Sequence, residues 1–199
     1  MWNQRNKITI DRPMQSKIIK FMATAMVVLA HTPAHADQND PNLDNLFAAL
    51  QTSLSTASAT SLEREIWAIW TRYPDDQAIN RQMDKAINIM NAGRLDVAEA
   101  MFSAIISREP AFAEAWNKRA TVRFFRGDDS GSADDILQVI KLEPRHFGAL
   151  LGLGMIKVRA GDLQGALQAY RAAQRINPFL PHIETIISEL RQELNGRAL

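Results

Sequence analysis

The sequence predicts an all-α fold, a right-handed solenoid in which three pairs of antiparallel helices stack side by side. Three prolines recur at one fixed interval of thirty-four positions, and three glycines recur at the same interval, each half a period before a proline: Pro110, Pro144, Pro178, Gly93, Gly127 and Gly161. A fixed period of this length indicates stacked units of supersecondary structure. No apolar alternation typical of strands accompanies it, so each unit is expected to consist of helices.

The three predicted units span residues 79–112, 113–146 and 147–180. Each begins with a helical pattern of about fourteen residues, turns at its glycine and continues into a second helix that ends before its proline. Glycine suits the left-handed position after a helix C-terminus. Proline cannot continue a helix and disfavours helical geometry in the residue before it. Each unit therefore predicts one antiparallel helix pair.

Small and large apolar residues recur in each unit where two helices must approach. The third unit shows the pattern most completely: Leu150, Leu153, Gly154, Ala166, Tyr170, Ala173 and Pro178. This pattern resembles the tetratricopeptide repeat (TPR) family, over roughly half of the chain. The chain also looks like the small signal-bearing TPR proteins of proteobacteria, in which a segment such as Pro144–Leu150 occurs. The resemblance implies a solenoid whose surface binds protein.

Residues 1–36 are predicted to be a secretory signal peptide. Lys17 and Lys20 precede the apolar run Phe21–Ala30, and small residues at 34–36 offer a cleavage site. Ten apolar residues are too few to cross a bilayer, which takes about 20. The alternative is an N-terminal anchor that stays uncut. Translation from Met14 rather than Met1 would give a more compact signal.

Removal of residues 1–36 changes the charge of the chain. It leaves 18 basic and 21 acidic side chains, a net charge of −3 instead of +1. A mildly acidic chain lacks the basic excess with which proteins bind nucleic acid. The sequence has no cysteine, which excludes disulfides and thiolate metal sites. We therefore expect a protein of the bacterial periplasm with no stable membrane insertion.

The segments that flank the three units are predicted to be helical as well, apart from a flexible stretch at 37–42. Residues 43–74 are interpreted as a degenerate fourth repeat that caps the N-terminal end, with a capping box at Thr60 and Glu63 opening its second helix. Trp67 on this helix either packs or makes an exposed contact. Residues 181–196 predict a C-terminal capping helix with one apolar face, because the last repeat would otherwise leave its own apolar face uncovered.

The residues that might support catalysis or metal binding are poorly arranged for it. His146 and His182 lie thirty-six positions apart, whereas helical metal ligands are expected at i and i+4. The acidic pairs at 128–129 and 134–135 lack the alternating ligands of a calcium loop and are expected to be solvated. Gly148, Gly152 and Gly154 lie on a predicted helix, which indicates close packing rather than phosphate binding. We therefore expect no metal, no cofactor and no enzymatic activity.

Arg119 stands at a repeat position that is usually apolar. The resemblance implies that it forms an ion pair across its helix pair with Asp135, and the alternative is a contact with a ligand.

The resemblance also implies a concave groove lined by the first helix of each unit. Its predicted lining is largely apolar with a polar margin: Asn80, Met83, Ile87, Met90, Asn117, Thr121, Phe124, Leu151, Met155, Val158 and Arg159. Met83 and Ile87 stand where the chaperone-binding members carry the lysine and asparagine that hold a terminal carboxylate. We therefore expect an apolar helical or extended protein segment as ligand. The alternatives are that these residues bury one another, or that the chain's own termini fill the groove.

The function expected from the sequence is that of a non-enzymatic adaptor or assembly factor for proteins of the periplasm. The second hypothesis is a structural protein that self-associates through the ends of its solenoid. The third is an enzyme whose site has no recognisable motif.

Overall fold

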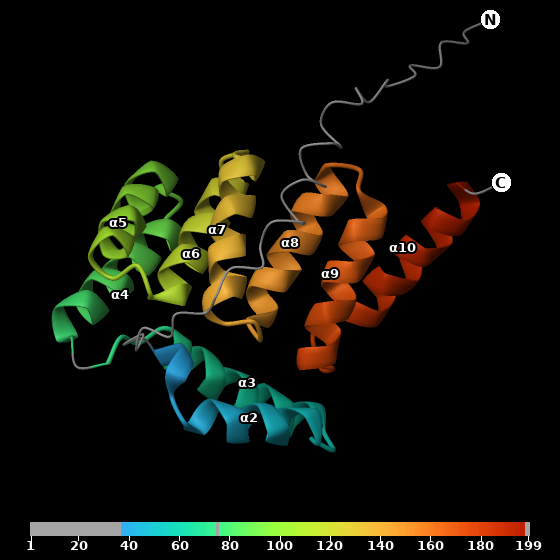
Figure 1. Cartoon of the computed structure of the whole chain (residues 1–199), viewed down its shortest axis with the longest axis horizontal. Helices are drawn as coiled ribbons and strands as arrows, with labels where there is room; N and C mark the ends of the chain where they lie inside the picture. The colour runs from blue at the N-terminus through green and yellow to red at the C-terminus, as the bar shows by residue number, and fades with distance from the viewer. Residues whose placement is uncertain (1–36, 75, 198–199) are drawn as a thin grey trace, which may run out of the picture. The chain divides into compact units, whose positions relative to one another are not determined.

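The structure is a computed structural model that describes residues 37–74 and 76–197 (Figure 1). The predicted signal peptide, the start at Met1 or Met14 and most of the cleavage region lie outside the described residues. Every element of secondary structure in the described part is a helix: η1 (Asp37–Asn39), α2 (Asn42–Gln51), α3 (Thr56–Trp70), α4 (Gln77–Asn91), α5 (Leu95–Arg108), α6 (Ala113–Phe125), α7 (Asp129–Leu142), α8 (Phe147–Arg159), α9 (Leu163–Ile176) and α10 (Ile183–Arg197).

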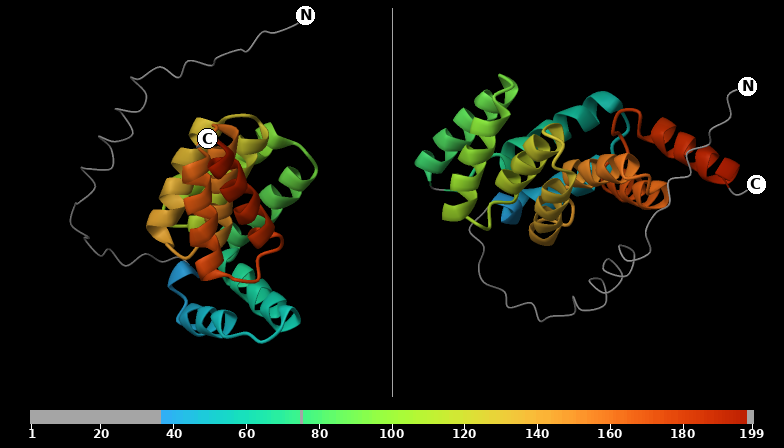
Figure 2. Two further views of the ribbon diagram at one scale, coloured as in Figure 1. Left: turned by 90° about the vertical axis from the view of Figure 1, so that its right-hand side faces the viewer. Right: turned by 90° about the horizontal axis from the view of Figure 1, so that it is seen from above.

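The three predicted units are three helix pairs, α4–α5, α6–α7 and α8–α9. The helices of each pair pack against each other, and α5 packs on α6 as α7 packs on α8 (Figures 1 and 2). Gly93, Gly127 and Gly161 have positive φ angles of 73°, 82° and 74° at the turns between paired helices. Left-handed backbone of this kind favours glycine, which confirms the predicted reason for its regular spacing.

The N-terminal region also forms a helix pair, but its second helix begins earlier than predicted. The Ser55 side chain accepts a hydrogen bond from the Ser58 amide at 3.2 Å and caps α3 at Thr56. The predicted capping box is therefore wrong. Thr60 lies inside the helix, and its hydroxyl donates to the Thr56 carbonyl at 2.8 Å.

The α2–α3 hairpin does not cap the first repeat, contrary to the predicted role of residues 43–74. Its buried residues Phe47, Ile66 and Trp70 share one hydrophobic cluster with Phe147 and other residues of α8, α9 and α10, while α4 and α5 belong to a different cluster. The hairpin lies along the edge formed by the loops between repeats (Figure 1).

Hydrogen bonds to three successive loops fix this position of the N-terminal region. Gln38 donates to the Ala111 carbonyl at 2.6 Å, and Arg145 pairs with Asp44 at 2.5 Å. The Asn177 side chain donates to Glu63 at 3.1 Å. The first repeat does not need a cap, because the exposed side chains of α4 are polar: Gln77, Arg81, Gln82, Asp84, Lys85, Asn88 and Asn91.

The C-terminal helix α10 covers the last repeat as predicted. Ile183, Ile187 and Leu190 are buried in the cluster that includes α9. The helix begins at Ile183 rather than Pro181, because His182 has a φ angle of 58°, which no α-helical residue adopts. Among the described residues, no helix is both long enough and apolar enough to cross a membrane.

Candidate functional site

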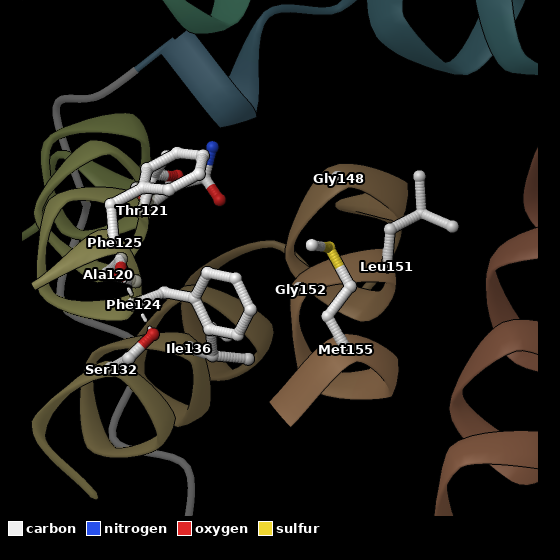
Figure 3. A pocket seen from close by; sticks show the side chains of 11 residues that line it. Ala120, Thr121, Phe124, Phe125, Ser132, Ile136, Gly148, Leu151, Gly152 and Met155 are labelled. Atoms are coloured by element: carbon white, nitrogen blue, oxygen red, sulfur yellow. Dashed lines mark hydrogen bonds between the residues drawn. The ribbon is translucent and has the colours of Figure 1, made fainter. Parts of the chain in front are cut away.

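A cleft of about 150 Å³ opens between α6 and α8, with α7 behind it (Figure 3). Phe124 of α6 and Met155 of α8 point toward each other across it. Five of the predicted groove residues line the cleft, together with six that were not among the predicted site residues: Asn117, Thr121, Phe124, Leu151 and Met155, then Ala120, Phe125, Ser132, Ile136, Gly148 and Gly152. The structure thus brings the second and third repeats of the predicted groove together around one opening.

Two glycines on α8 leave room for the cleft. Gly148 and Gly152 stand one full repeat after Glu114 and Lys118, which carry large side chains at the same positions of α6. A Cβ atom at Gly152 would lie 3.2 Å from the Cδ1 atom of Ile136, in tight contact with the back wall. Because Gly152 has no side chain, α8 packs closely against Ile136 at the back of the cleft. Close packing, rather than phosphate binding, is the role that the sequence indicated for this glycine.

Apolar side chains are exposed around the cleft. Phe125 and Met155 line it and are 65% and 44% exposed, whereas Val158, three residues after Met155 on α8, is not part of the lining and is 42% exposed. They are three of the five most exposed large apolar side chains in the described part of the chain. Exposed apolar groups that gather in one place mark interaction surfaces. The other two, Leu54 and Leu137, lie on the α2–α3 loop and on α7.

The polar side chains of the cleft are already hydrogen-bonded within the chain. Asn117 donates to Glu114 at 2.9 Å. The Thr121 hydroxyl donates to the Asn117 carbonyl at 3.0 Å, and the Ser132 hydroxyl donates to the Ala120 carbonyl at 2.8 Å. Each of these three side chains therefore already donates a hydrogen bond within the chain before any ligand arrives.

Arg159, predicted as part of the polar margin, covers one side of Phe124. Its guanidinium carbon lies 3.7 Å from the centre of the Phe124 ring. It pairs with Asp129 at 2.6 Å and donates to the Phe124 carbonyl at 3.2 Å. These contacts hold the ring of Phe124 in place at the cleft.

The first repeat contributes less to the groove than predicted. Met83 has no exposed surface and lies in the cluster of Phe102, Phe112 and Val122, so its assignment to an open groove is wrong. Ile87 and Met90 are partly buried against the same cluster.

Asn80 is also occupied within the chain. It accepts a hydrogen bond from the Tyr73 amide at 2.7 Å and donates to the Tyr73 carbonyl at 2.9 Å. Asn80 therefore holds the segment before α4 rather than facing an open groove.

Helix α3 packs against α8 at Gly148, one of the residues that line the cleft. The Trp67 ring packs so closely on Gly148 that a Cβ atom there would lie 2.7 Å from the ring carbon Cη2. The ring also contacts Trp70 and Phe147 edge-on, with centroid distances of 5.2 Å and 5.5 Å. The packing interpretation of Trp67 is therefore correct, and the hairpin covers the part of the groove next to Gly148.

A buried polar cluster joins the hairpin to α6 and α8, and the sequence analysis missed it. His146 accepts a hydrogen bond from the Ala149 amide at its Nδ1 atom (3.1 Å) and donates from Nε2 to Glu114 at 2.9 Å. Trp70 stacks on the imidazole at a centroid distance of 4.1 Å. Glu114 and His146 are each 1% exposed. One feature of the sequence could have indicated a special role for Glu114, because this charged residue stands where the third repeat has Gly148.

The charge of Glu114 is stabilised inside this cluster. Burial alone would raise the pKa of its carboxyl, but Lys118 and His146 outweigh that cost and hold the pKa below its ordinary value. The Lys118 Nζ atom lies 3.0 Å from Oε1, a charge contact, whereas the His146 N–H forms a hydrogen bond to Oε2. Glu114 therefore stays a carboxylate although it is buried.

The predicted ion pair between Arg119 and Asp135 is present. Two hydrogen bonds of 2.9 Å and 2.7 Å join the guanidinium to the carboxylate, and the side chains are 13% and 2% exposed. Arg123 also contacts Asp135 at 3.1 Å. Asp135 is therefore buried and paired, so the expectation that it is solvated is wrong.

Within the described residues, no group of three histidine, aspartate or glutamate side chains is placed to hold a metal ion. Asp128 instead caps α7 by accepting from the Gly131 amide at 2.9 Å.

The fold and the cleft define a helical-repeat protein in which paired helices carry an apolar opening between neighbouring units. The sequence model of the tetratricopeptide repeat matches residues 83–138 and 127–181. A TPR repeat-containing protein of Rhizobium etli is 32% identical over 154 residues, which cover 77% of this chain and 75% of that protein. The chain belongs to the tetratricopeptide repeat family.

Two further proteins are similar to this chain. A tetratricopeptide repeat and J domain-containing co-chaperone of Fusarium oxysporum is 30% identical over 79% of the chain, which spans 29% of the co-chaperone. The first TPR domain of Spaghetti (RPAP3), solved with an HSP90 peptide, superimposes with a TM-score of 0.58 at 16% identity. That comparison covers 61% of this chain and 96% of the domain, and it bears on the fold alone.

Proposed function

We propose that the chain is a non-enzymatic protein-binding module that holds an apolar segment of a partner in the cleft between α6 and α8. The observation that carries the proposal is the exposure of Phe125 and Met155 in the lining of the cleft, with Val158 exposed three residues after Met155 on α8. The polar side chains of the cleft already hydrogen-bond within the chain. Burial of exposed apolar surface is the main favourable term in most protein association. A partner that covers these three side chains would gain that free energy.

Two observations favour a protein segment over a small molecule. The cleft of about 150 Å³ is well below the roughly 300–1,000 Å³ typical of small-molecule sites. The solved domain of similar fold, the first TPR of Spaghetti, was determined with a bound peptide. A cleft of this size suits a single side chain of a longer segment.

The place of action that we propose is the bacterial periplasm, where the chain would act as an adaptor or assembly factor. The proposal rests on the order of charged, apolar and small residues in 1–36. Mass spectrometry of the protein purified from a cell extract tests it. A chain that begins at Asp37 in the periplasmic fraction is expected, and an intact N-terminal segment on cytoplasmic protein would remove both the cleavage and the location.

Variants of exposed cleft residues test the binding proposal. Phe125→Ser together with Met155→Gln removes apolar surface at the cleft, whereas Leu137→Ser removes an exposed apolar side chain from α7. Native protein and Leu137→Ser are expected to retain the same partners from a periplasmic extract, quantified by mass spectrometry, and the double variant is expected to lose them. Equal retention by all three proteins would show that the cleft is not the binding site.

Self-association through the ends of the solenoid has less support. The exposed residues of α10, which covers the last repeat, are polar or small, and Glu184, Glu189 and Arg191 are among them. Light scattering at increasing protein concentration separates the two functions, because a binding module is expected to keep a constant mass without its partner.

A further inference from the structure

We infer that the partner segment is an amphipathic α-helix that docks with an uncharged face and inserts one large apolar side chain into the cleft. The inference rests on the proposed function and narrows it, since the sequence leaves both a helical and an extended ligand open. Three features of the walls carry it: their hydrogen-bond donors, their charges and the position of α3.

The hydrogen-bond donors of the cleft favour a helical segment over an extended one. An extended chain presents backbone carbonyls that need donors, and a buried carbonyl without one is costly. In the cleft the amide of Asn117 donates to Glu114, and the hydroxyls of Thr121 and Ser132 donate to backbone carbonyls of α6. The walls themselves are helices, whose backbone groups bond internally. A helical ligand needs no donor from the wall, because its own carbonyls accept bonds from its own amides.

The charges of the walls favour an uncharged docking face. Every charged side chain of α6 and α8 is paired within the chain: Glu114 with Lys118, Arg119 with Asp135, Arg123 with Glu99, Lys157 with Asp162 and Arg159 with Asp129. A charge on the buried face of the partner would lose water and gain no counter-charge, which is costly. Charge complementarity therefore requires that the partner helix carries its charged side chains on the face that points away from the cleft.

The position of α3 limits where a partner helix can lie. Trp67 already occupies the end of the groove at Gly148, so a partner must cross at the other end, where Phe125, Met155 and Val158 are exposed. Helix α3 itself places one large side chain, that of Trp67, against this face of α8. A partner helix beside α3 would continue that interface, with its own large side chain between Phe124 and Met155.

Selection from a displayed library tests the inference with defined probes. Random segments of about 16 residues, long enough for roughly four helical turns, are selected on the purified protein and counter-selected on the Phe125→Ser, Met155→Gln variant. Leu137→Ser serves as the matched control. Recovered segments are expected to carry apolar residues at i, i+3 or i+4, and i+7, with no charge on that face.

Synthetic peptides of the recovered segments provide the second measurement. Their far-ultraviolet circular dichroism is expected to show helix formation on binding, and a central proline is expected to weaken binding by at least about tenfold while a central alanine on the polar face does not. Alternating apolar patterns, acidic C-termini, or binding without helix formation would overturn the inference and leave the proposed function standing. If every recovered segment binds the native protein and the cleft variant equally well, the inference and the proposed function are both wrong. Recovery of segments that match this chain itself, with a concentration-dependent dimer, would replace the partner by a second copy and overturn the inference.

Discussion

The junction between α4 and α6 and the junction between α6 and α8 each join the first helices of two successive repeats, with opposite results. At the first junction Met83 is completely buried with Phe112 and Val122, and the space between the helices is filled. At the second, Gly148 and Gly152 replace the large side chains that α6 carries at the equivalent positions, and a cleft opens. The period fixes where the helices lie, whereas the size of a few side chains decides where the groove can receive a ligand.

The two junctions share helix α6, and the strongest test of the comparison removes the ion pair that holds α6 to α7. Asp135→Ala leaves Arg119 without its partner in a site where Asp135 is 2% exposed, so we expect a loss of about 3 kcal/mol or more in the free energy of unfolding. Urea unfolding measures it. The neighbouring Asp134 is exposed, and Asp134→Ala is expected to change stability by less than about 0.5 kcal/mol.

A double-mutant cycle with Arg119→Ala and Asp135→Ala separates the pair from the rest of the network. Coupling between the two substitutions is expected, because Arg119 and Asp135 contact each other directly. Absence of coupling would show that Arg119 does not depend on Asp135 and is available to a ligand.

The second prediction compares one methionine from each junction. Met83→Ala leaves a cavity in the filled junction and is expected to cost about 2–5 kcal/mol, whereas Met155→Ala at the open one is expected to cost less than about 1 kcal/mol because the side chain is 44% exposed. Equilibrium unfolding of the two variants measures the difference. Equal losses would mean that the two junctions are packed alike and would contradict the comparison.

Most of the fold follows from the sequence because its signals are local. The positive φ angles at Gly93, Gly127 and Gly161 are needed at the same point of each helix pair, so glycine recurs with the period of the structure. The C-terminal cap was also predictable, since one apolar face of residues 181–196 had to be covered. Such features depend on residues near one another in the chain.

The position of the hairpin was not predictable in this way. It depends on which distant surface offers the best fit for Trp67 and Trp70, and that surface is formed by Gly148, His146 and Glu114. None of these three residues carries a local pattern that indicates a contact with the hairpin. A similar dependence on distant contacts explains why Met83 was placed in the groove, because its buried cluster includes residues as far along the chain as Phe112 and Val122.

The third prediction uses the two glycines that open the second junction. Gly148→Ala would bring a Cβ atom within 2.7 Å of the Trp67 ring, and overpacking of this kind costs about 1–3 kcal/mol. Gly152→Ala meets the movable end of Ile136 at 3.2 Å and gains helix propensity, so its net effect is expected to be within about 1 kcal/mol. Thermal unfolding compares the two variants. A larger loss for Gly152→Ala than for Gly148→Ala would show that α3 does not rest on Gly148.

The smallest expected effect concerns Glu114, which stands in α6 where α8 has Gly148. The pKa of its carboxyl lies below the ordinary value of 4.5 in the folded chain, because Lys118 and His146 outweigh the opposing effect of burial. Its charge therefore contributes stability that is present above about pH 4.5 and is lost as the pH falls through the folded-state pKa. Glu114→Gln keeps an acceptor for His146, so at neutral pH we expect a loss of only about 1 kcal/mol.

The pH dependence of this loss shows whether the buried contact is ionic. Below pH 4.5 the free energies of unfolding of the native protein and of Glu114→Gln should converge, since the native protein alone loses the carboxylate. Glu65→Gln, at an exposed position of α3, is the control and should follow the native protein at every pH. A gap between native protein and Glu114→Gln that widens with acidification would mean that the buried cluster holds a protonated Glu114, and that the polar contact between α6, α8 and the hairpin is not an ionic one.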